Sequence, residues 1–202
     1  MQKKRASTIC SGIILLSALL SNLAWADWAL VSNQSALTFV STKAGNIAEV
    51  HKFSSIKGQV TAKGAAIIEI DLISIDSAIP IRDERMQKFL FETAKFPKAK
   101  IVADVSGVLK KSKSAAYVTA SVPAQLQLHG QEQSITLELA VATLNDGQIM
   151  VSATQPTIVN ASGFDLVAGI EKLREIAGLP AISHSVPVSF SLLFAPSPTK
   201  AH

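Results

Sequence analysis

The sequence predicts an all-β protein, either an antiparallel sandwich or a closed barrel, and two observations support that prediction. Apolar and polar residues alternate along most of the chain, as in the run Val186–Phe194, where large apolar residues recur at every second position. Side chains of a strand point alternately to its two faces, so each such run has one buried and one solvated face. Turn residues separate the runs, and helices do not alternate with them, which favours antiparallel pairing.

The chain begins with the features of a secretory signal peptide. The cations of residues 3–5 precede an apolar run from Ile13 to Leu20, and Ala24-Trp25-Ala26 places small residues at the −3 and −1 positions before Asp27. This order is typical of cleaved export signals, and the apolar run is short for a membrane span; an uncleaved anchor is the alternative. We expect residues 1–26 to be removed after Ala26, leaving one mature domain, 27–202, in the periplasm.

Eight or more short strands are expected along the mature chain. The candidate runs are Leu37–Lys43, Ile47–Phe53, Ile56–Ala62, Ile68–Leu72, Ile101–Val105, Tyr117–Val122, Gln125–His129, Ile135–Val141, Ile149–Thr154 and Val186–Phe194. Turn residues follow several of them, at Lys63-Gly64, Ser106-Gly107, His129-Gly130 and Asn145-Asp146-Gly147. Dipeptides of this kind mark tight connections between antiparallel strands.

Two segments are predicted to be helical. Asp83–Thr93 places Met86, Phe89 and Leu90 at i, i+3 and i+4, and its acidic start suits a helix N-terminus. Val167–Ala177 also has a helical apolar face, and Gly178 follows it as a plausible C-terminal cap. We therefore expect one or two short helical insertions in the β domain.

Charge and cysteine content argue against a nucleic-acid partner and against cysteine chemistry. The 19 basic and 15 acidic residues give a net charge of +4, but three of the cations belong to the signal segment. The mature chain is thus close to neutral, which argues against a nucleic-acid partner. The only cysteine, Cys10, also lies in the signal segment, so the mature chain is expected to have neither a disulfide nor thiolate chemistry.

Sequence motifs for catalysis and metal binding are missing. There is no G-x-S-x-G, no P-loop and no G-x-G-x-x-G, and the four histidines lack metal-ligand spacing. Glu49 and His51 are two residues apart, so both project from the same side of a strand. They could be half of a metal site, although a solvated or hydrogen-bonded pair is the more ordinary interpretation. We therefore predict that the protein is not an enzyme and has no catalytic residues, metal or resident cofactor.

Several motifs resemble those of the YceI-like family. Ile81–Phe91, followed by Lys95-Phe96-Pro97, resembles the family signature R-D-x-x-L/M-x-x-x-x-F … F/Y-P. Further matching pieces occur in the same order as in the family: Leu37-Thr38-Phe39 with Phe53 and Lys57-Gly58, Leu126–Gly130 for L-T-L-x-G, and Ser162–Leu166 for S-x-F-G-L. Two features depart from the pattern, since Asp165 replaces the usual glycine and Gly169–Gly178 forms an additional helical stretch.

The resemblance implies an extended, lipocalin-like antiparallel β-barrel of about eight strands with an apolar interior. It also implies a polyisoprenoid or similar amphiphilic lipid as the ligand, with a quinone-like lipid as one alternative. The ligand-binding residues expected from the matched motifs are Phe39, Phe53, Arg82, Met86, Phe89, Leu90, Phe96 and Phe164. Each apolar member of this set could instead be part of the core.

Charged residues in and near the motifs have two interpretations each. Arg82 and Arg85 could bind a phosphate or quinone head at the barrel mouth. Alternatively, Arg82 pairs with a carboxylate that fixes the helical insertion, and Arg85 belongs to a solvated face. Lys110, Lys111 and Lys113 could touch an anionic membrane or form a solvated hairpin tip.

Three classes of function are consistent with these observations. The preferred one is an exported binding protein that stores or transports an amphiphilic lipid, with transient membrane contact and a homodimer as open alternatives. The second is a periplasmic stress-response or interaction protein whose barrel is filled and has no lipid ligand. The third is a weak enzyme acting on a bound lipid, which would require perturbed titratable groups facing the cavity.

Overall fold

The computed structural model describes residues 28–197, which form twelve strands, three α-helices and several shorter helical turns. The predicted signal peptide lies outside these residues. The strands are β1 (Trp28–Leu30), β2 (Ala36–Lys43), β3 (Ile47–Phe53), β4 (Ile56–Val60), β5 (Ala65–Asp71), β6 (Ile75–Asp76), β7 (Lys98–Asp104), β8 (Tyr117–Leu128), β9 (Gln131–Thr143), β10 (Ile149–Ala153), β11 (Thr157–Asn160) and β12 (Ser185–Pro196). The α-helices are α1 (Pro80–Arg85), α2 (Ser106–Ser112) and α3 (Val167–Ile176).

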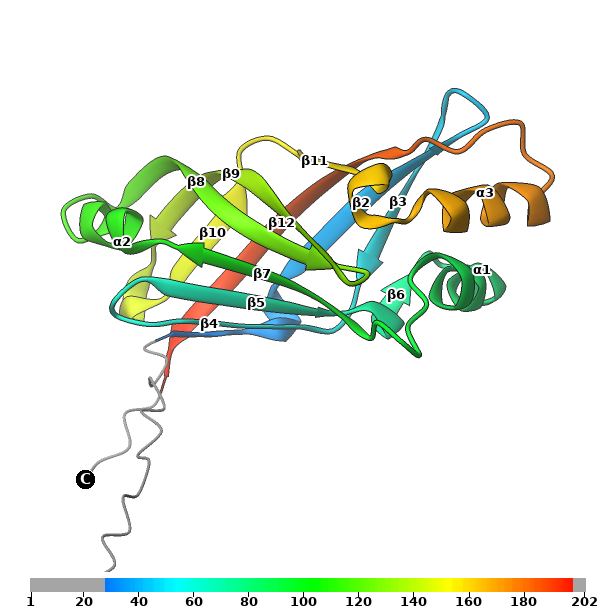
Figure 1. The fold of residues 1–202 in the computed structure, drawn as a ribbon. Helices are drawn as coiled ribbons and strands as arrows, with labels where there is room; N and C mark the ends of the chain where they lie inside the picture. The colour runs from blue at the N-terminus through cyan, green and yellow to red at the C-terminus, as the bar shows by residue number, and fades with distance from the viewer. Residues whose placement is uncertain (1–27, 198–202) are drawn as a thin grey trace, which may run out of the picture.

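A closed, eight-stranded antiparallel barrel forms the centre of the fold, in the order β1-β4-β5-β7-β8-β9-β10-β12 (Figure 1). The short strand β1 closes the ring, because Trp28 is the register partner of Val60 in β4 and of Pro196 in β12. Closure leaves no unpaired edge within this ring. The predicted lipocalin-like barrel of about eight strands is therefore confirmed.

Four additional strands extend the barrel toward α1 and α3. β2 continues along the edge of β12 that β1 occupies, with Phe39 opposite Val188, and β3 and β6 follow it. β11 continues along the other edge of β12, beyond β10. The result is an elongated barrel with α1 and α3 at one end and α2 at the other (Figure 1).

Strand alternation places the apolar residues inside, as the sequence pattern predicts. In β8, Val118, Val122 and Leu126 are buried, whereas Thr119 and Gln125 are exposed. β8 is one continuous strand rather than the two runs expected at its ends, because its register with β9 is unbroken from Tyr117 to Leu128. β1 and β11 were not predicted, since three or four residues are too few to display an alternation.

The first helical segment is shifted relative to its prediction, Asp83–Thr93. α1 begins at Pro80, where the fixed φ of proline suits the first helical turn. It continues into η3 (Met86–Leu90), a π-helical turn in which the N–H of Phe91 donates to the carbonyl of Met86. The second prediction is confirmed, since α3 spans Val167–Ile176 and is followed by Gly178 with φ of 62°.

A third helix, α2, corrects the sequence prediction for residues 106–113. Ser106-Gly107 was expected to be a turn, and a solvated hairpin tip was one interpretation of the lysines after it. Instead, Asp104 Oδ1 accepts the N–H of Ser106 at 2.8 Å, and a seven-residue helix follows. Two turns are too short to show a helical period in the sequence. No helix between residues 28 and 197 is long and apolar enough to cross a membrane.

Candidate functional site

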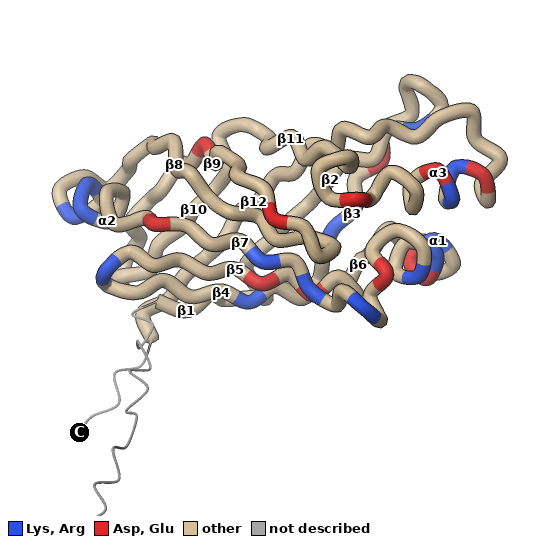
Figure 2. Tube along the Cα trace, in the orientation of Figure 1, with Lys and Arg blue, Asp and Glu red and all other residues tan. Residues whose placement is uncertain are grey.

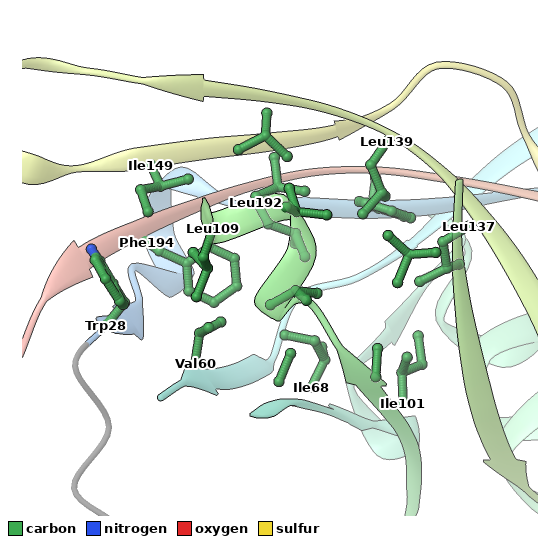
Figure 3. Close-up of a pocket in the computed structure, with 18 of the residues that line it drawn as sticks. Trp28, Val60, Ile68, Ile101, Leu109, Leu137, Leu139, Ile149, Leu192 and Phe194 are labelled. Atoms are coloured by element: carbon green, nitrogen blue, oxygen red, sulfur yellow. The ribbon is translucent and has the colours of Figure 1, made fainter. Parts of the chain in front are cut away.

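The barrel interior contains a first cavity at the α2 end, with about 870 Å³ of space between atoms. All nineteen of its lining residues are apolar, and Figure 3 shows side chains from several strands and from α2 converging on it. Leu109 and Val108 of α2 line this end of the cavity. Trp28 contributes its ring while Nε1 donates to the carbonyl of Gly147 at 3.1 Å, so its polar atom is satisfied. The first cavity therefore suits a hydrocarbon chain.

A second cavity of about 940 Å³ adjoins the first one. Thr157 is the only polar residue in its lining. The two cavities share four lining residues, which we call the waist: Leu37, Ile101, Leu137 and Phe190. Phe190 and Leu37 are register partners on β12 and β2, whereas Ile101 lies on β7, four places from β12 in the eight-stranded ring. The waist thus lies at the junction of the two apolar chambers, and its side chains come from opposite walls of the barrel.

A third cavity, of about 820 Å³, lies between β2, β3, α1 and α3. It shares Phe39, Leu90, Ile170 and Val186 with the second cavity, so the three cavities follow one another along the barrel. Its lining differs because it also contains polar and charged residues: Ser41, Lys43, Glu49, His51, Arg82, Arg85 and Ser183. The interior therefore changes from hydrocarbon at the α2 end to polar at the α1 and α3 end.

Glu49 is the centre of the charged group in the third cavity. Its Oε2 atom accepts from Lys43 Nζ and from Arg82 Nη1, both at 2.7 Å. The hydrogen bond from Lys43, with the Arg82 charge, holds the pKa of Glu49 below its ordinary value, although partial burial opposes this shift. Arg82 also donates from Nε to Ser77 Oγ at 2.9 Å and from Nη2 to the Ser77 carbonyl at 2.7 Å. These bonds fix α1 against β3.

His51 lies next to this charged group and is almost completely buried, with 3% of its surface exposed. The edge of its ring faces Phe39 at 5.2 Å between centroids, and a row of rings continues through Phe53 to Phe91. Burial lowers the pKa of His51, so the imidazole is neutral at neutral pH. Among the described residues, no group of three His, Cys, Asp or Glu could hold a metal ion.

Five of the eight predicted ligand-binding residues line the cavities. Phe39, Phe53 and Leu90 line the second cavity, and Arg82 and Met86 line the third, together with Phe39 and Leu90. The aliphatic walls of the first and second cavities were not named as site residues. The sequence nevertheless marks such residues as inward-facing, because Leu137 and Phe190 lie at the apolar positions of the alternating pattern in predicted strands.

The three other predicted residues lie elsewhere. Phe89 is half-buried, with Lys88 Nζ 5.1 Å from its ring centroid. Phe96 packs on His129 with 4.5 Å between ring centroids. Phe164 is buried in a smaller cluster beside α3, with Leu166 and Ile170. None of the three lines any of the three cavities described above.

Comparison with known proteins identifies the family. The model of the YceI-like domain matches residues 28–194, which is almost the whole described chain. The protein belongs to the YceI-like family. No curated protein sequence matches this YceI-like chain significantly.

Several solved structures have a similar fold. A polyisoprenoid-binding domain from Saccharophagus degradans, implicated in plant cell wall breakdown, is 34% identical with a TM-score of 0.82, and the match covers 86% of this chain and all of that domain. BcnA from Burkholderia cenocepacia is 20% identical with a TM-score of 0.63, covering 81% of this chain and 98% of BcnA. The YceI protein of Campylobacter jejuni is 15% identical with a TM-score of 0.51, covering 73% and 84%. The last two similarities concern the fold alone.

The structure also explains one departure from the YceI-like sequence pattern. Asp165 occupies the position where the family commonly has glycine, and its φ of 56° lies in the left-handed region. Glycine adopts this conformation without strain, and Asp is among the few other residues that tolerate it. The turn between η5 (Ala161–Phe164) and α3 is therefore preserved despite the substitution.

Proposed function

We propose that this YceI-like protein is an exported, non-catalytic binding protein that holds a polyisoprenoid or similar amphiphilic lipid inside its barrel, for storage or transport. This proposal rests on the arrangement of three adjoining cavities, two apolar and one polar, that follow one another along the barrel. The lipid tail would pass the waist and end near Trp28 and α2. The head would lie among the polar residues of the third cavity.

The polyisoprenoid-binding domain from Saccharophagus degradans supports this proposal, because it is the relative with 34% identity over its full length. The lining of the interior agrees with it as well, since the walls of both chambers are almost wholly apolar, as hydrocarbon-binding sites are. A barrel of eight strands either fills its centre with side chains or retains space for a ligand. The open chambers therefore favour the lipid-binding interpretation over a filled barrel.

The energetics suit a carrier or a store that exchanges its lipid with membranes. A buried tail of about forty carbons would gain on the order of 15–20 kcal/mol relative to water, from ~25 cal/mol per Å² over roughly 700 Å². Most of this gain disappears when the tail comes from a membrane, where it is already dehydrated, and ordering the chain costs free energy. Exchange with a membrane is thus much easier than release into water.

The α1 and α3 end is the part of the surface that would contact the membrane transiently. Ile47, Ile79 and Ile81 are there, with between 44% and 51% of their surfaces exposed. Figure 2 shows charged residues of both signs on α1 and α3 beside them. An apolar rim with neighbouring charges is typical of an interfacial contact surface. The polar cavity lies at this same end, which would place the lipid head nearest the membrane.

Native mass spectrometry of the protein purified from the periplasm of its own host tests the proposal. We expect a stoichiometric adduct whose extracted lipids differ by whole isoprene units. The matched control is Leu137→Trp, which should narrow the waist and reduce the amount of long-chain adduct. A bare polypeptide mass that stays unchanged after addition of prenols or quinones would contradict lipid binding and favour the interaction-protein alternative.

A further inference from the structure

His51, which lines the third cavity, has a buried hydrogen-bonding atom without a partner. Its Nδ1 atom is fully buried and has no hydrogen-bond partner among the described residues, while the side chain lines the cavity. A buried polar atom without a partner costs roughly 1–3 kcal/mol, and such atoms are rare in native proteins. An unsatisfied atom on a side chain that lines a ligand cavity therefore points to a ligand group that completes its hydrogen bond.

The cations around His51 are already bonded to protein acceptors. Lys43 and Arg82 share the Glu49 carboxylate, and all three guanidinium nitrogens of Arg82 donate to Glu49 or Ser77. Asp83 accepts the N–H of Ser77 at 2.9 Å and adds a second negative charge near the ring. Two positive and two negative charges thus oppose each other here, and the charges of Lys43 and Arg82 are already balanced by Glu49 and Asp83.

Arg85 is the one charged residue of this cavity to which no partner is assigned among residues 28–197. It is half-buried and lines the cavity. If the ligand head were a phosphate, Arg85 would be the guanidinium expected to bind it. The two side chains therefore favour different head groups, and substitutions can distinguish them.

The protonation state of His51 favours an uncharged head. Burial and the charges of Arg82 and Lys43 lower the pKa of the ring, and Glu49 and Asp83 oppose this shift only in part. A neutral imidazole has one donor and one acceptor nitrogen. It can bond a hydroxyl or a carbonyl oxygen, whereas it has no charge with which to compensate a phosphate for its lost hydration.

We propose that His51 determines the head-group specificity of the barrel, with its Nδ1 atom hydrogen-bonded to an uncharged oxygen, a hydroxyl or a carbonyl, of the lipid head. This inference rests on the proposed lipid-binding function. Phe39, which contacts the His51 ring and lines both the second and the third cavity, marks the point where the tail would give way to the head.

The test measures dissociation constants of the delipidated mature protein for four ligands with tails of equal length: a prenol, a prenyl quinone, a prenyl phosphate and a prenyl hydrocarbon without a head. The variants are His51→Phe, which keeps an aromatic ring, His51→Asn, which restores a polar atom near the Nδ1 position, and Arg85→Gln. Circular dichroism and thermal unfolding establish that each variant folds. The wild-type comparison of prenol with phosphate does not depend on any variant.

We expect wild type to bind the prenol or the quinone more tightly than the phosphate. His51→Phe should weaken binding of the preferred neutral ligand about tenfold, the value of one hydrogen bond to a buried group. Binding of the hydrocarbon should stay unchanged, His51→Asn should recover part of the loss, and Arg85→Gln should weaken binding of the neutral ligands less than His51→Phe does. The relative losses for prenol and quinone identify which oxygen is bound.

Two results would overturn the inference while leaving lipid binding intact. One is unchanged affinity of His51→Phe for both neutral ligands when the hydrocarbon still binds. The other is tightest binding of the phosphate, with a loss in Arg85→Gln and none in His51→Phe. If wild type bound none of the four ligands, including the hydrocarbon, the proposed function itself would fail.

Discussion

Arg82 of α1 and Glu49 of β3 form an ion pair in which Nη1 donates to Oε2 at 2.7 Å. The two residues are distant in sequence, and their side chains are only about a quarter to a third exposed. Of the two alternatives that the sequence leaves open for Arg82, the structure supplies the carboxylate partner that the second one requires. This pair joins α1 to strand β3, and removing it tests whether it holds α1 in place.

Replacing Arg82 with Ala should destabilise the fold by about 2 kcal/mol, because Glu49 loses one cation and Ser77 loses two donors in a partly buried setting. Urea unfolding measures this difference. Arg85→Ala is the control, since no bond is assigned to that side chain among the described residues, and its free energy of unfolding should change by less than about 0.5 kcal/mol. Equal effects of the two substitutions would show that the ion pair does not fix α1.

The stability of the fold should depend on pH through Glu49. Its pKa in the folded protein lies below the ordinary value of 4.5, chiefly because Lys43 donates to it. The stabilisation is therefore complete above about pH 4.5 and is lost as the pH falls further. Glu49→Gln should be less stable than wild type at pH 7, and the difference between the two should shrink as the pH falls below 4.5.

The difference between variant and wild type is the quantity to measure in that experiment. His51 has a lowered pKa, so its protonation also destabilises the fold as the pH falls below 6.5. Both proteins retain His51, and most of this second contribution therefore cancels. A stability difference that stays constant from pH 7 to pH 3 would contradict the assigned shift of Glu49.

The sequence predicted the barrel well because the inward face of each strand is a local property. Leu137 and Phe190 can be assigned to an inner face from their neighbours alone. The position of α1 was predicted less well, because it depends on contacts with distant residues such as Glu49. Whether an aromatic residue of a motif faces a cavity also depends on packing, and Phe164 and Phe96 lie outside the cavities for this reason.

The waist should determine which tail lengths can enter the first cavity. Leu137→Trp adds a large ring at the junction of the two chambers, which Phe190 and Leu37 also line. We expect weaker binding of long prenols, by at least tenfold, and little change for short ones that fit the second cavity alone. Val50→Trp is the control, because Val50 is 67% exposed on the outer face. Equal losses for short and long prenols would show that the waist does not divide the site.

The packing of α3 on η3 depends on Gly169, which has no side chain at the point of closest approach. A Cβ atom there would lie 2.5 Å from the carbonyl oxygen of Phe89 and 2.9 Å from Cα of Leu90. Both are backbone atoms, so the helix and the π-helical turn would have to separate. Gly169→Ala should destabilise the fold by about 1–3 kcal/mol, because the overlap exceeds the helix propensity gain of up to about 1 kcal/mol.

Gly107→Ala is the matched control for this prediction, since Gly107 lies in α2 and a Cβ atom added there would meet nothing within 4 Å. Its free energy of unfolding should rise by about 0.5–1 kcal/mol, the usual gain for alanine in a helix. Chemical unfolding of both variants measures whether the free energy of unfolding falls in Gly169→Ala and rises in Gly107→Ala.

Because Leu90 and Ile170 line the second and third cavities at this contact, Gly169→Ala should also exchange a bound prenol with vesicles faster. Unchanged stability and exchange in Gly169→Ala would mean that α3 and η3 are free to separate without opening the lipid site.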